Sequence, residues 1–388
     1  MSIPPNTEDQ TTKVATLPSL TSLRFFAAFA VFLFHVTLSS SPLPPHGPIN
    51  PFADSTIAQT LESLFGQFGY IGVSFFFILS GFVITWATPD RFSVKRFFWR
   101  RLMKIYPPHI VVWAISLLLF AGAYTTPQTA LLNLTLFHPF SPDPTVYVSV
   151  NPPAWSLSSD LFFYILFPFL APLVRSIPED WIGRSIGLVV LGMFAVILIT
   201  TYIVPSEPKS PISPISGAQF WFNYIFPASR MLEFFLGMFG ARLLMSGRWR
   251  RIDLMSSGLA LVASVLIAKQ LPFLYTFGIC YVLPLLAIIT ECAALDREGK
   301  TPKWLGDALM LWLGRVSFGF YLVQGLSIFW LSKALGLQNL SMAGGIGAIL
   351  LFFCMSMVGG WLLYRFVEEP AMKMTRRLSQ ARVLRQSA

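Results

Sequence analysis

The sequence contains little charge for its length. Asp, Glu, Lys and Arg make up 12% of its 388 residues, whereas a soluble globular domain carries about 25%. Hydrophobic residues account for 54% of the chain, and no alternating strand pattern of a membrane barrel appears. This composition excludes an ordinary soluble domain and predicts an all-α, polytopic membrane protein.

Cysteine and histidine are also scarce. The three cysteines, Cys280, Cys292 and Cys354, lie in or at the ends of apolar runs, which is typical of packing residues rather than of a disulfide set. The His, Cys, Asp and Glu residues show no metal-ligand spacing, and no nucleotide-binding glycine pattern is present. We therefore predict no metal, no permanently bound cofactor and no nucleotide hydrolysis.

Long apolar runs, by contrast, fill most of the chain. A membrane-spanning helix needs about 20 consecutive apolar residues. Segment 128–140 is too short and too closely flanked by proline to span, and Glu368–Glu369–Pro370 is expected to end the last helix. The sequence predicts about ten transmembrane helices, at 20–38, 67–87, 107–124, 155–174, 186–204, 220–244, 252–268, 272–293, 316–334 and 342–366.

Lysine and arginine are concentrated in alternate intervals between these runs. Six lie between the second and third runs, whereas intervals 39–66 and 125–154 contain none. The positive-inside rule then predicts that both termini are cytoplasmic in a multi-pass protein of the cell (inner or plasma) membrane. The net charge of +10 therefore reflects topology, and we expect contact with the lipid bilayer rather than with nucleic acid.

The same pattern predicts the domain organisation. Residues 1–18 lack the apolar core of a cleavable signal peptide, and we expect a flexible cytoplasmic tail there. We expect a membrane domain at 19–370 and a basic cytoplasmic tail at 371–388. The outer intervals 39–66 and 125–154 suit a cover over an outward-facing cavity.

The first apolar run contains two ionisable residues, Arg24 and His35. Such residues are costly inside a membrane, so they are functional candidates. Eleven residues at about 100° each is three turns plus roughly 20°, which puts both side chains on one helix face, roughly 16 Å apart along the axis. Alternatively, Arg24 could be a cation that reaches the lipid headgroups, and His35 could be a hydrogen-bonded packing residue.

Seven segments match, in order, the sequence blocks of one family. They are LPSLTSLRFFAAFAVFLFHV (17–36), FGYIGVSFFFILSGFVITW (68–86), RFFWRRLMKIYP (96–107), PAWSLSSDLFFYILFP (153–168), SRMLEFFLGMFGARLL (229–244), SFGFYLVQ (317–324) and YRFVEEP (364–370). Through these blocks the chain resembles the acyltransferase 3 family of integral-membrane O-acyltransferases. The segments LPSLTSLRFFAA and NPPAWSLS are similar to an actinomycete branch that acylates macrolides.

The resemblance implies an acyltransferase and its substrates. An acyl group, commonly acetyl, would pass from cytoplasmic acyl-CoA, a co-substrate, to a hydroxyl. The acceptor would be a glycan, such as a surface-polysaccharide precursor, or a glycosylated small molecule of the macrolide type. The chain departs from the family pattern at three positions: Lys104 replaces an arginine, Asp160 a glutamate and Gln324 a frequent histidine.

Three residues are the catalytic candidates. His35 is the expected general base, because a neutral imidazole accepts a proton near physiological pH. Arg24 could bind coenzyme phosphate, stabilise charge or pair with an acid such as Glu233. Asp160 could orient His35 or bind acceptor hydroxyls, and the alternative for Asp160 is capping of its helix.

The other candidates would bind substrate. We expect a basic group to hold the phosphates of the coenzyme. It consists of Arg96, Arg100, Arg101 and Lys104. The alternative for this group is contact with anionic lipid. Trp155 could stack on a sugar beside Ser156. Arg230 and Glu233, three residues apart on one helix face, could form a structural ion pair or part of the site wall. Tyr321 and Gln324 could line the cavity or form interhelical bonds only.

A transporter or flippase for a glycolipid or an acyl group is the main alternative function. Buried Arg, Glu and Asp in a ten-span protein would suit either class. Transporters often show internal repeats with matching broken helices, and the two halves of this sequence show no convincing repeat.

Overall fold

The computed structural model describes residues 16–43, 46–210 and 213–375. Within these ranges the chain is helical, apart from connecting segments and two isolated β-bridges. The α-helices are α1 (Pro18–Val36), α2 (Ser55–Phe65), α3 (Phe68–Ala87), α4 (Val94–Leu119), α5 (Pro127–Leu134), α6 (Pro144–Tyr147), α7 (Trp155–Ser176), α8 (Ile182–Tyr202), α9 (Gly217–Phe220), α10 (Pro227–Met245), α11 (Leu254–Ala268), α12 (Val282–Arg297), α13 (Lys303–Gly306), α14 (Ala308–Gly325), α15 (Leu331–Ala334) and α16 (Met342–Leu363).

The all-α, polytopic prediction is confirmed. Among the described residues, eight helical segments are long and apolar enough to cross a membrane. The expected spans at 220–244 and 252–268 are not among these eight. The first contains helix α10, which carries Arg230, Glu233 and Arg242, and the second is helix α11, which has only 15 residues. A helix nevertheless lies at each of the ten expected positions.

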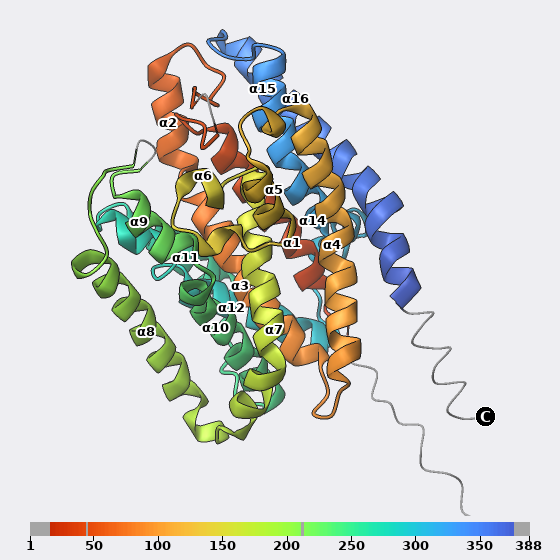
Figure 1. Ribbon diagram of the computed structural model, residues 1–388. Helices are drawn as coiled ribbons and strands as arrows, with labels where there is room; N and C mark the ends of the chain where they lie inside the picture. The colour runs from red at the N-terminus through yellow and green to blue at the C-terminus, as the bar shows by residue number, and fades with distance from the viewer. Residues whose placement is uncertain (1–15, 44–45, 211–212, 376–388) are drawn as a thin grey trace, which may run out of the picture.

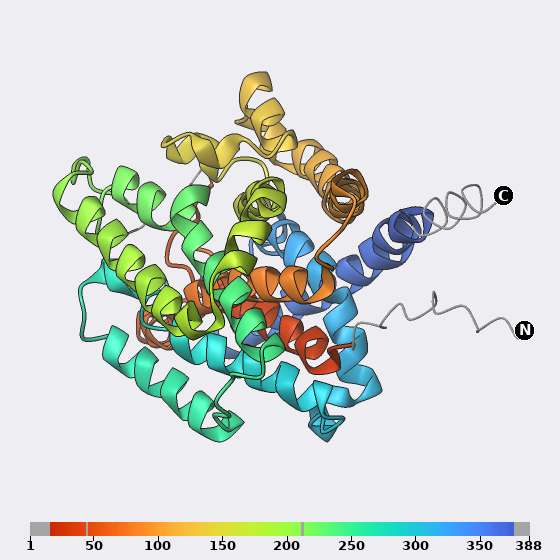
Figure 2. The same cartoon turned by 90° about the horizontal axis from the view of Figure 1, so that it is seen from below.

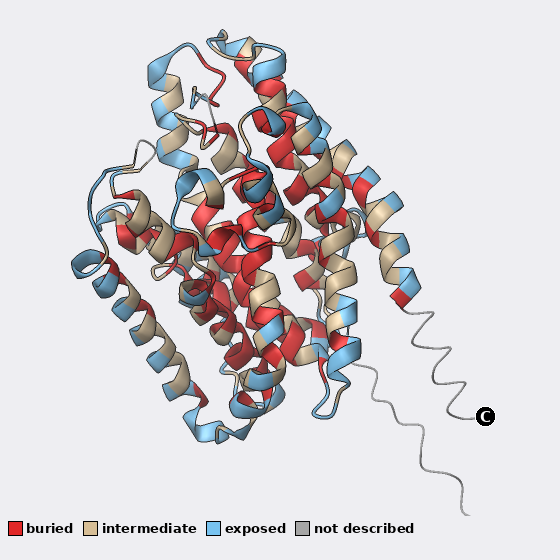
Figure 3. Cartoon of the chain, in the orientation of Figure 1, coloured by how far each residue is buried: buried red, intermediate tan, exposed pale blue. Residues whose placement is uncertain are grey.

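Helices α1 and α3 form the centre of the bundle. Helix α3 packs against α10 and α1, and α1 packs against α14. Viewed from below, α8, α11 and α16 lie at the periphery (Figure 2). Buried residues are concentrated in the middle of the bundle, whereas α8 is largely pale blue and tan (Figure 3). Exposed leucines on α8, such as Leu188 and Leu191, suit contact with lipid.

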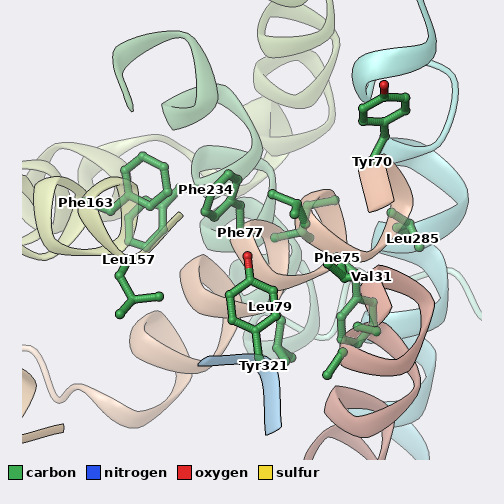
Figure 4. Packing of buried hydrophobic residues seen from close by; sticks show 14 of the residues in the cluster. Val31, Tyr70, Phe75, Phe77, Leu79, Leu157, Phe163, Phe234, Leu285 and Tyr321 are labelled. Carbon is green, nitrogen blue, oxygen red and sulfur yellow. The ribbon is translucent and has the colours of Figure 1, made fainter. Parts of the chain in front are cut away.

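Glycines let the central helices approach one another closely. A Cβ on Gly237 of α10 would lie 1.9 Å from the carbonyl oxygen of Ile78 on α3, and a Cβ on Gly81 of α3 would lie 2.0 Å from that of Phe234. Small residues at such crossings allow backbone contact between membrane helices. Beside this crossing, the rings of Phe77 and Phe234 lie close to Phe163 of α7 (Figure 4), with centroid distances of 5.2 and 5.0 Å to the Phe163 ring.

The N-terminus of α1 is held by a distant helix. Its N-cap residue, Leu17, forms no side-chain cap. Instead, the carboxylate of Asp296 at the end of α12 accepts hydrogen bonds from the Ser19 backbone N–H at 2.9 Å and hydroxyl at 2.7 Å. The Ser22 hydroxyl donates to the Leu305 carbonyl at 2.6 Å. These contacts fix the position of α1 in the bundle, and with it the depths of Arg24 and His35.

The connections between helices lie at two opposite ends of the bundle. Helices α2 and α15 lie at the upper end in Figure 1, and the α3–α4 and α7–α8 connections lie at the lower end. The upper segments are tied together, because the backbone N–H of Leu340 donates to the carbonyl of Pro51 at 2.8 Å and the Gln338 amide donates to that of Pro48 at 2.9 Å. The α3–α4 connection and the basic first part of α4 therefore lie away from the segments that contain no Lys or Arg.

The expected end of the last helix at Pro370 is wrong. The helical segment that begins at Met342 continues through Pro370 to Thr375. A π-helical turn, Tyr364–Glu368, ends two residues before this proline. A proline inside a helix lacks an N–H and clashes with the carbonyl four residues earlier, and the wider turn at that carbonyl accommodates it. Of the two expected tails, residues 1–15 and 376–388 lie outside the described residues.

Candidate active site

A cavity of about 600 Å³ lies beneath the two long segments that contain no lysine or arginine. Ser39, Ser40 and Pro42 line it from the first segment, and Val148, Pro152 and Pro153 line it from the second. The prediction that these segments cover a cavity is confirmed. Helices α1, α2, α3, α7, α9, α11 and α14 also contribute to the wall, together with the π-helical segment Trp221–Ile225 and the 3-10 segment Phe273–Phe277. Sites that bind drug-sized ligands have volumes of this order.

His35 lines this cavity from the last turn of α1. Its Nδ1 atom is buried and forms no hydrogen bond with any described residue, so Nε2 is the ring nitrogen that can meet a ligand. The rings of Phe34 and Phe329 pack on the imidazole, with centroid distances of 5.2 and 5.8 Å. The side chain of Gln324 on α14 lies within hydrogen-bonding reach.

Trp155 and Tyr321 line the cavity with His35. The Tyr321 hydroxyl is 2.8 Å from the Ser156 hydroxyl, which also donates to the Pro153 carbonyl at 3.0 Å. Helix α7 begins at Trp155 without any side-chain cap. The alternative interpretation of Asp160 as a capping residue is therefore wrong, since its side chain accepts no N–H of the first turn of α7.

A second polar group lies deeper, towards the basic end of the bundle. The charge of Arg24 acts on Asp160 and Tyr164 of α7 and on Arg101 and Lys104 of α4. We call these five residues the charged cluster. Its cations outnumber its one carboxylate, Asp160, whose Oδ1 atom is buried and has no hydrogen-bond partner in the described part of the chain.

Aromatic rings and one further acid hold the basic side chains of this cluster. The Arg101 guanidinium lies 5.4 Å from the centroid of the Phe97 ring and 5.3 Å from that of Tyr164. Lys104 forms an ion pair with the buried Glu368. Arg101 and Lys104 are thus partly buried, whereas Arg96 and Arg100 are exposed. The structure divides the four predicted phosphate ligands into an inner and an outer pair.

Arg230 and Glu233 form a buried ion pair with a distance of 2.8 Å. Arg230 also donates to the Phe277 carbonyl at 2.9 Å and the Ser74 hydroxyl at 3.2 Å. Neither residue lines the 600 Å³ cavity. The Arg230 guanidinium instead lies 5.0 Å from the ring centroid of Tyr224, which does line it. The pair supports the cavity wall from behind. The charged neighbours of Arg24 are instead those of the cluster.

Many cavity residues were not among the sequence candidates, and four of them are Glu62, Gln67, Tyr70 and Tyr224. Glu62 accepts a hydrogen bond from Ser39 at 3.1 Å and faces Tyr70. The rings of Tyr70 and Tyr224 meet edge to face at 5.0 Å. Glu62 could have been noticed as a rare acid in a segment without Lys or Arg. Tyr224 carries no such signal, because its place depends on the π-helical turn.

Comparisons with known proteins identify the family of this chain. A family model described as an acyltransferase domain, Acyl_transf_3, matches residues 17–365. The chain belongs to the acyltransferase 3 family. It is 33% identical over 374 residues to "Acyltransferase MdmB" of Streptomyces mycarofaciens, covering 93% of each chain. The protein is therefore a membrane acyltransferase.

One more distant relative is larger than this chain. The chain is 22% identical over 342 residues to "Peptidoglycan O-acetyltransferase OatA" of Listeria monocytogenes. This match covers 79% of the present chain and 48% of the Listeria protein. No solved structure matches the chain.

Proposed function

We propose that this acyltransferase moves an acyl group from cytoplasmic acyl-CoA to a hydroxyl of an acceptor bound in the 600 Å³ cavity, with His35 as general base. The observation that carries the proposal is the position of His35. Among the described residues it is the one histidine that lines the cavity, and it shares a helix with Arg24, which belongs to the charged cluster. Acetyl is the first acyl group to test.

The chemistry needs a base beside the acceptor and a donor that reaches the same point. The acceptor hydroxyl gives its proton to His35 Nε2 as its oxygen attacks the thioester carbonyl. When the tetrahedral intermediate collapses, the C–S bond breaks and the coenzyme sulfur takes that proton. The products are an ester and free coenzyme A.

The charged cluster supports binding of the donor. Coenzyme A is anionic, and Arg24, Arg101 and Lys104 present three cations against the carboxylates of Asp160 and Glu368. Cations that can donate several hydrogen bonds are the usual ligands of phosphate. About 16 Å of helix separates Arg24 from His35. A pantetheine arm would cross that span and deliver the thioester to the base.

The distribution of basic residues supports the orientation. Arg91 in the α3–α4 connection and the five Lys and Arg residues in the first part of α4 lie at the end opposite the segments covering the cavity. The positive-inside rule assigns that end to the cytoplasm. Both termini would then be cytoplasmic, and the cavity would open towards the outer face of the cell membrane.

The cavity favours an amphipathic small molecule as acceptor. Aromatic, proline and aliphatic side chains form most of its wall, and Ser39, Ser40, Gln67 and Glu62 supply local polar contacts. A glycosylated metabolite of the macrolide type has this mixed character. A glycan precursor is the second acceptor class, supported by the name of the Listeria relative.

The test compares wild type with His35→Gln in membranes that receive radiolabelled acetyl-CoA and candidate acceptors. We expect wild type to form an alkali-labile labelled ester and the variant to lose more than 100-fold in rate, the order of magnitude for a general base. His46→Asn is the matched control, because His46 lies outside the cavity wall and Asn tolerates its φ of 60°.

Other outcomes would contradict or narrow the proposal. Equal transfer by a correctly folded His35→Gln protein would remove His35 from the mechanism. Transfer of label to the macrolide-type acceptor alone, or to the glycan alone, decides between the two acceptor classes. Movement of an acceptor across sealed vesicles without ester formation would instead support the transporter alternative.

A further inference from the structure

We propose that Gln324 is a positioning residue that selects the tautomer of His35, holding the proton on Nδ1 so that Nε2 is free to act as base. This inference rests on the proposed function of His35. Gln324 occupies a position where the family frequently has histidine, so the sequence alone leaves its part in the mechanism open.

Unpaired polar atoms mark the contact between the two side chains. Gln324 is fully buried on α14, and its side chain reaches the imidazole of His35 on α1. His35 Nδ1 and both amide atoms of Gln324 nevertheless form no hydrogen bond with any described residue. Buried polar groups in proteins are nearly always paired. A small rotation that joins these two side chains would satisfy atoms on both.

The chemistry of the amide decides which tautomer results. If Gln324 Oε1 accepts from Nδ1–H, the lone pair of Nε2 faces the cavity and can take the acceptor proton. If the amide NH₂ donates to Nδ1 instead, the proton lies on Nε2 and the imidazole cannot act as base. The ring nitrogens of histidine are routinely distinguished by a partner in this way.

The surroundings keep the imidazole in place for this contact. The π-helical segment Leu326–Trp330 begins two residues after Gln324 and carries Phe329, whose ring packs edge-on against His35. Phe34 covers the ring from the same helix as His35. Rotation of the imidazole is therefore limited, and the partner at Nδ1 determines how the ring is used.

Asp160 does not take this role. The groups that act on Asp160 are Ser80, Arg24 and Arg101, and the side chain that acts on His35 is that of Gln324. The charged groups lining the cavity, Glu62 and Lys269, come from α2 and from the end of α11. The partner of the base is thus a neutral amide, which orients the ring without adding charge beside it.

The first measurement is ¹⁵N NMR of histidine-labelled protein in lipid nanodiscs. The chain has four histidines, and comparison with His35→Gln assigns the signals of His35. We expect wild type to show a protonated Nδ1 and an unprotonated Nε2, and Gln324→Leu to show a mixture of tautomers. An unchanged His35 tautomer in Gln324→Leu would overturn the inference.

Kinetics provide the second measurement. We expect kcat to fall about 10- to 100-fold in Gln324→Leu with little change in KM for acetyl-CoA, as for other side chains that orient a reactive group. Gln324→Glu keeps an acceptor at Oε1 and should recover part of kcat. If Gln324→Leu fails to fold, Gln324→Met replaces it in both measurements. Gln128→Leu on the exposed face of α5 is the matched control.

The two proposals fail in different ways. If His35→Gln retains transfer, the proposed function of His35 fails and Gln324 has no base to position. If His35→Gln is inactive while Gln324→Leu and Gln324→Glu both match wild type in kcat, only the positioning inference fails.

Discussion

Tyr321 on α14 and Ser156 on α7 join their two helices through hydroxyl groups 2.8 Å apart. Tyr321 also lines the cavity that contains His35. The pair can therefore act as an interhelical bond, as an acceptor ligand through Tyr321, or as both. Tyr321→Phe and Ser156→Ala separate these roles. Both remove the bond between the two hydroxyls, and only Tyr321→Phe removes the phenol hydroxyl.

Tyr321→Phe should raise KM for the acceptor about 10-fold if the phenol contacts it, the effect of losing one hydrogen bond worth about 1.4 kcal/mol. Ser156→Ala should leave acceptor KM close to wild type, because the phenol remains. Steady-state kinetics with varied acceptor and saturating acetyl-CoA measure both. Equal changes in the two variants would reduce Tyr321 to a helix–helix contact.

The Arg230–Glu233 pair should matter for stability rather than for substrate binding. Removal of one partner from a buried ion pair costs about 3–5 kcal/mol, because the other charge remains buried and unpaired. We expect Arg230→Met to lower the free energy of unfolding in detergent by this order, with an unchanged acetyl-CoA KM. The double variant Arg230→Met/Glu233→Met should be more stable than either single variant, and a larger loss in the double variant would contradict this account.

The crossing of α3 and α10 should tolerate no side chain at Gly237, where a Cβ would lie 1.9 Å from the Ile78 carbonyl oxygen. We expect Gly237→Ala to lower the thermal midpoint by several degrees, because both backbones must separate. Gly187→Ala is the matched control. Nothing lies within 4 Å of its Cβ position, and alanine is favoured over glycine inside a helix by about 1 kcal/mol. Equal thermal midpoints for the two variants would show that α3 and α10 can separate at this crossing with little loss of stability.

Much of the fold follows from the sequence because it depends on local patterns. Long apolar runs predict helices at all ten positions, and spacing alone places Arg24 and His35 on one face of α1. The location of Arg230 could not be predicted in this way. Helical periodicity gives its face on α10, but the packing of α3 and of the Trp221–Ile225 turn decides that this face lies behind the cavity wall. Pro370 failed as a helix end for a similar reason, because the π-helical turn before it carries no clear sequence signal.

Segment 127–147 contains a buried histidine that should make stability depend on pH. His138 lies in the short 3-10 segment His138–Phe140, and neither of its ring nitrogens has a hydrogen-bond partner in the described structure. Burial lowers the pKa of His138 from 6.5 to about 3, and the neighbouring His109 adds to this effect. The folded state therefore holds His138 neutral, whereas the unfolded chain binds a proton below pH 6.5.

The free energy of unfolding should then fall as the pH drops below 6.5, because His138 binds a proton in the unfolded state and stays neutral in the folded state. Between pH 6.5 and pH 5 this amounts to about 2 kcal/mol, at 1.36 kcal/mol per pH unit. His138→Leu should lack this part of the pH dependence, although other groups still titrate. Urea unfolding in detergent at pH 5 and pH 7 measures the difference, and parallel losses in both proteins would contradict the assignment.

Arg101 provides the sharpest test of the donor site. Its planar guanidinium lies against the rings of Phe97 and Tyr164, at 5.4 and 5.3 Å from their centroids. Lysine keeps the charge but loses both the planar stacking and the forked donors that match a phosphate. We expect Arg101→Lys to raise KM for acetyl-CoA about 10-fold, a loss of roughly 1.4 kcal/mol, with little effect on acceptor KM. Arg91→Lys, at an exposed position just before the same helix, should change neither value.

The alternative role of this basic group is contact with anionic lipid, and it gives a different result. Lysine serves that role as well as arginine, because the attraction to a charged membrane surface depends on charge rather than on geometry. Arg101→Lys would then insert and bind acetyl-CoA like wild type. A changed donor KM at normal membrane insertion therefore identifies Arg101 as a ligand of the coenzyme. Reduced insertion with an unchanged KM would assign it to the lipid surface.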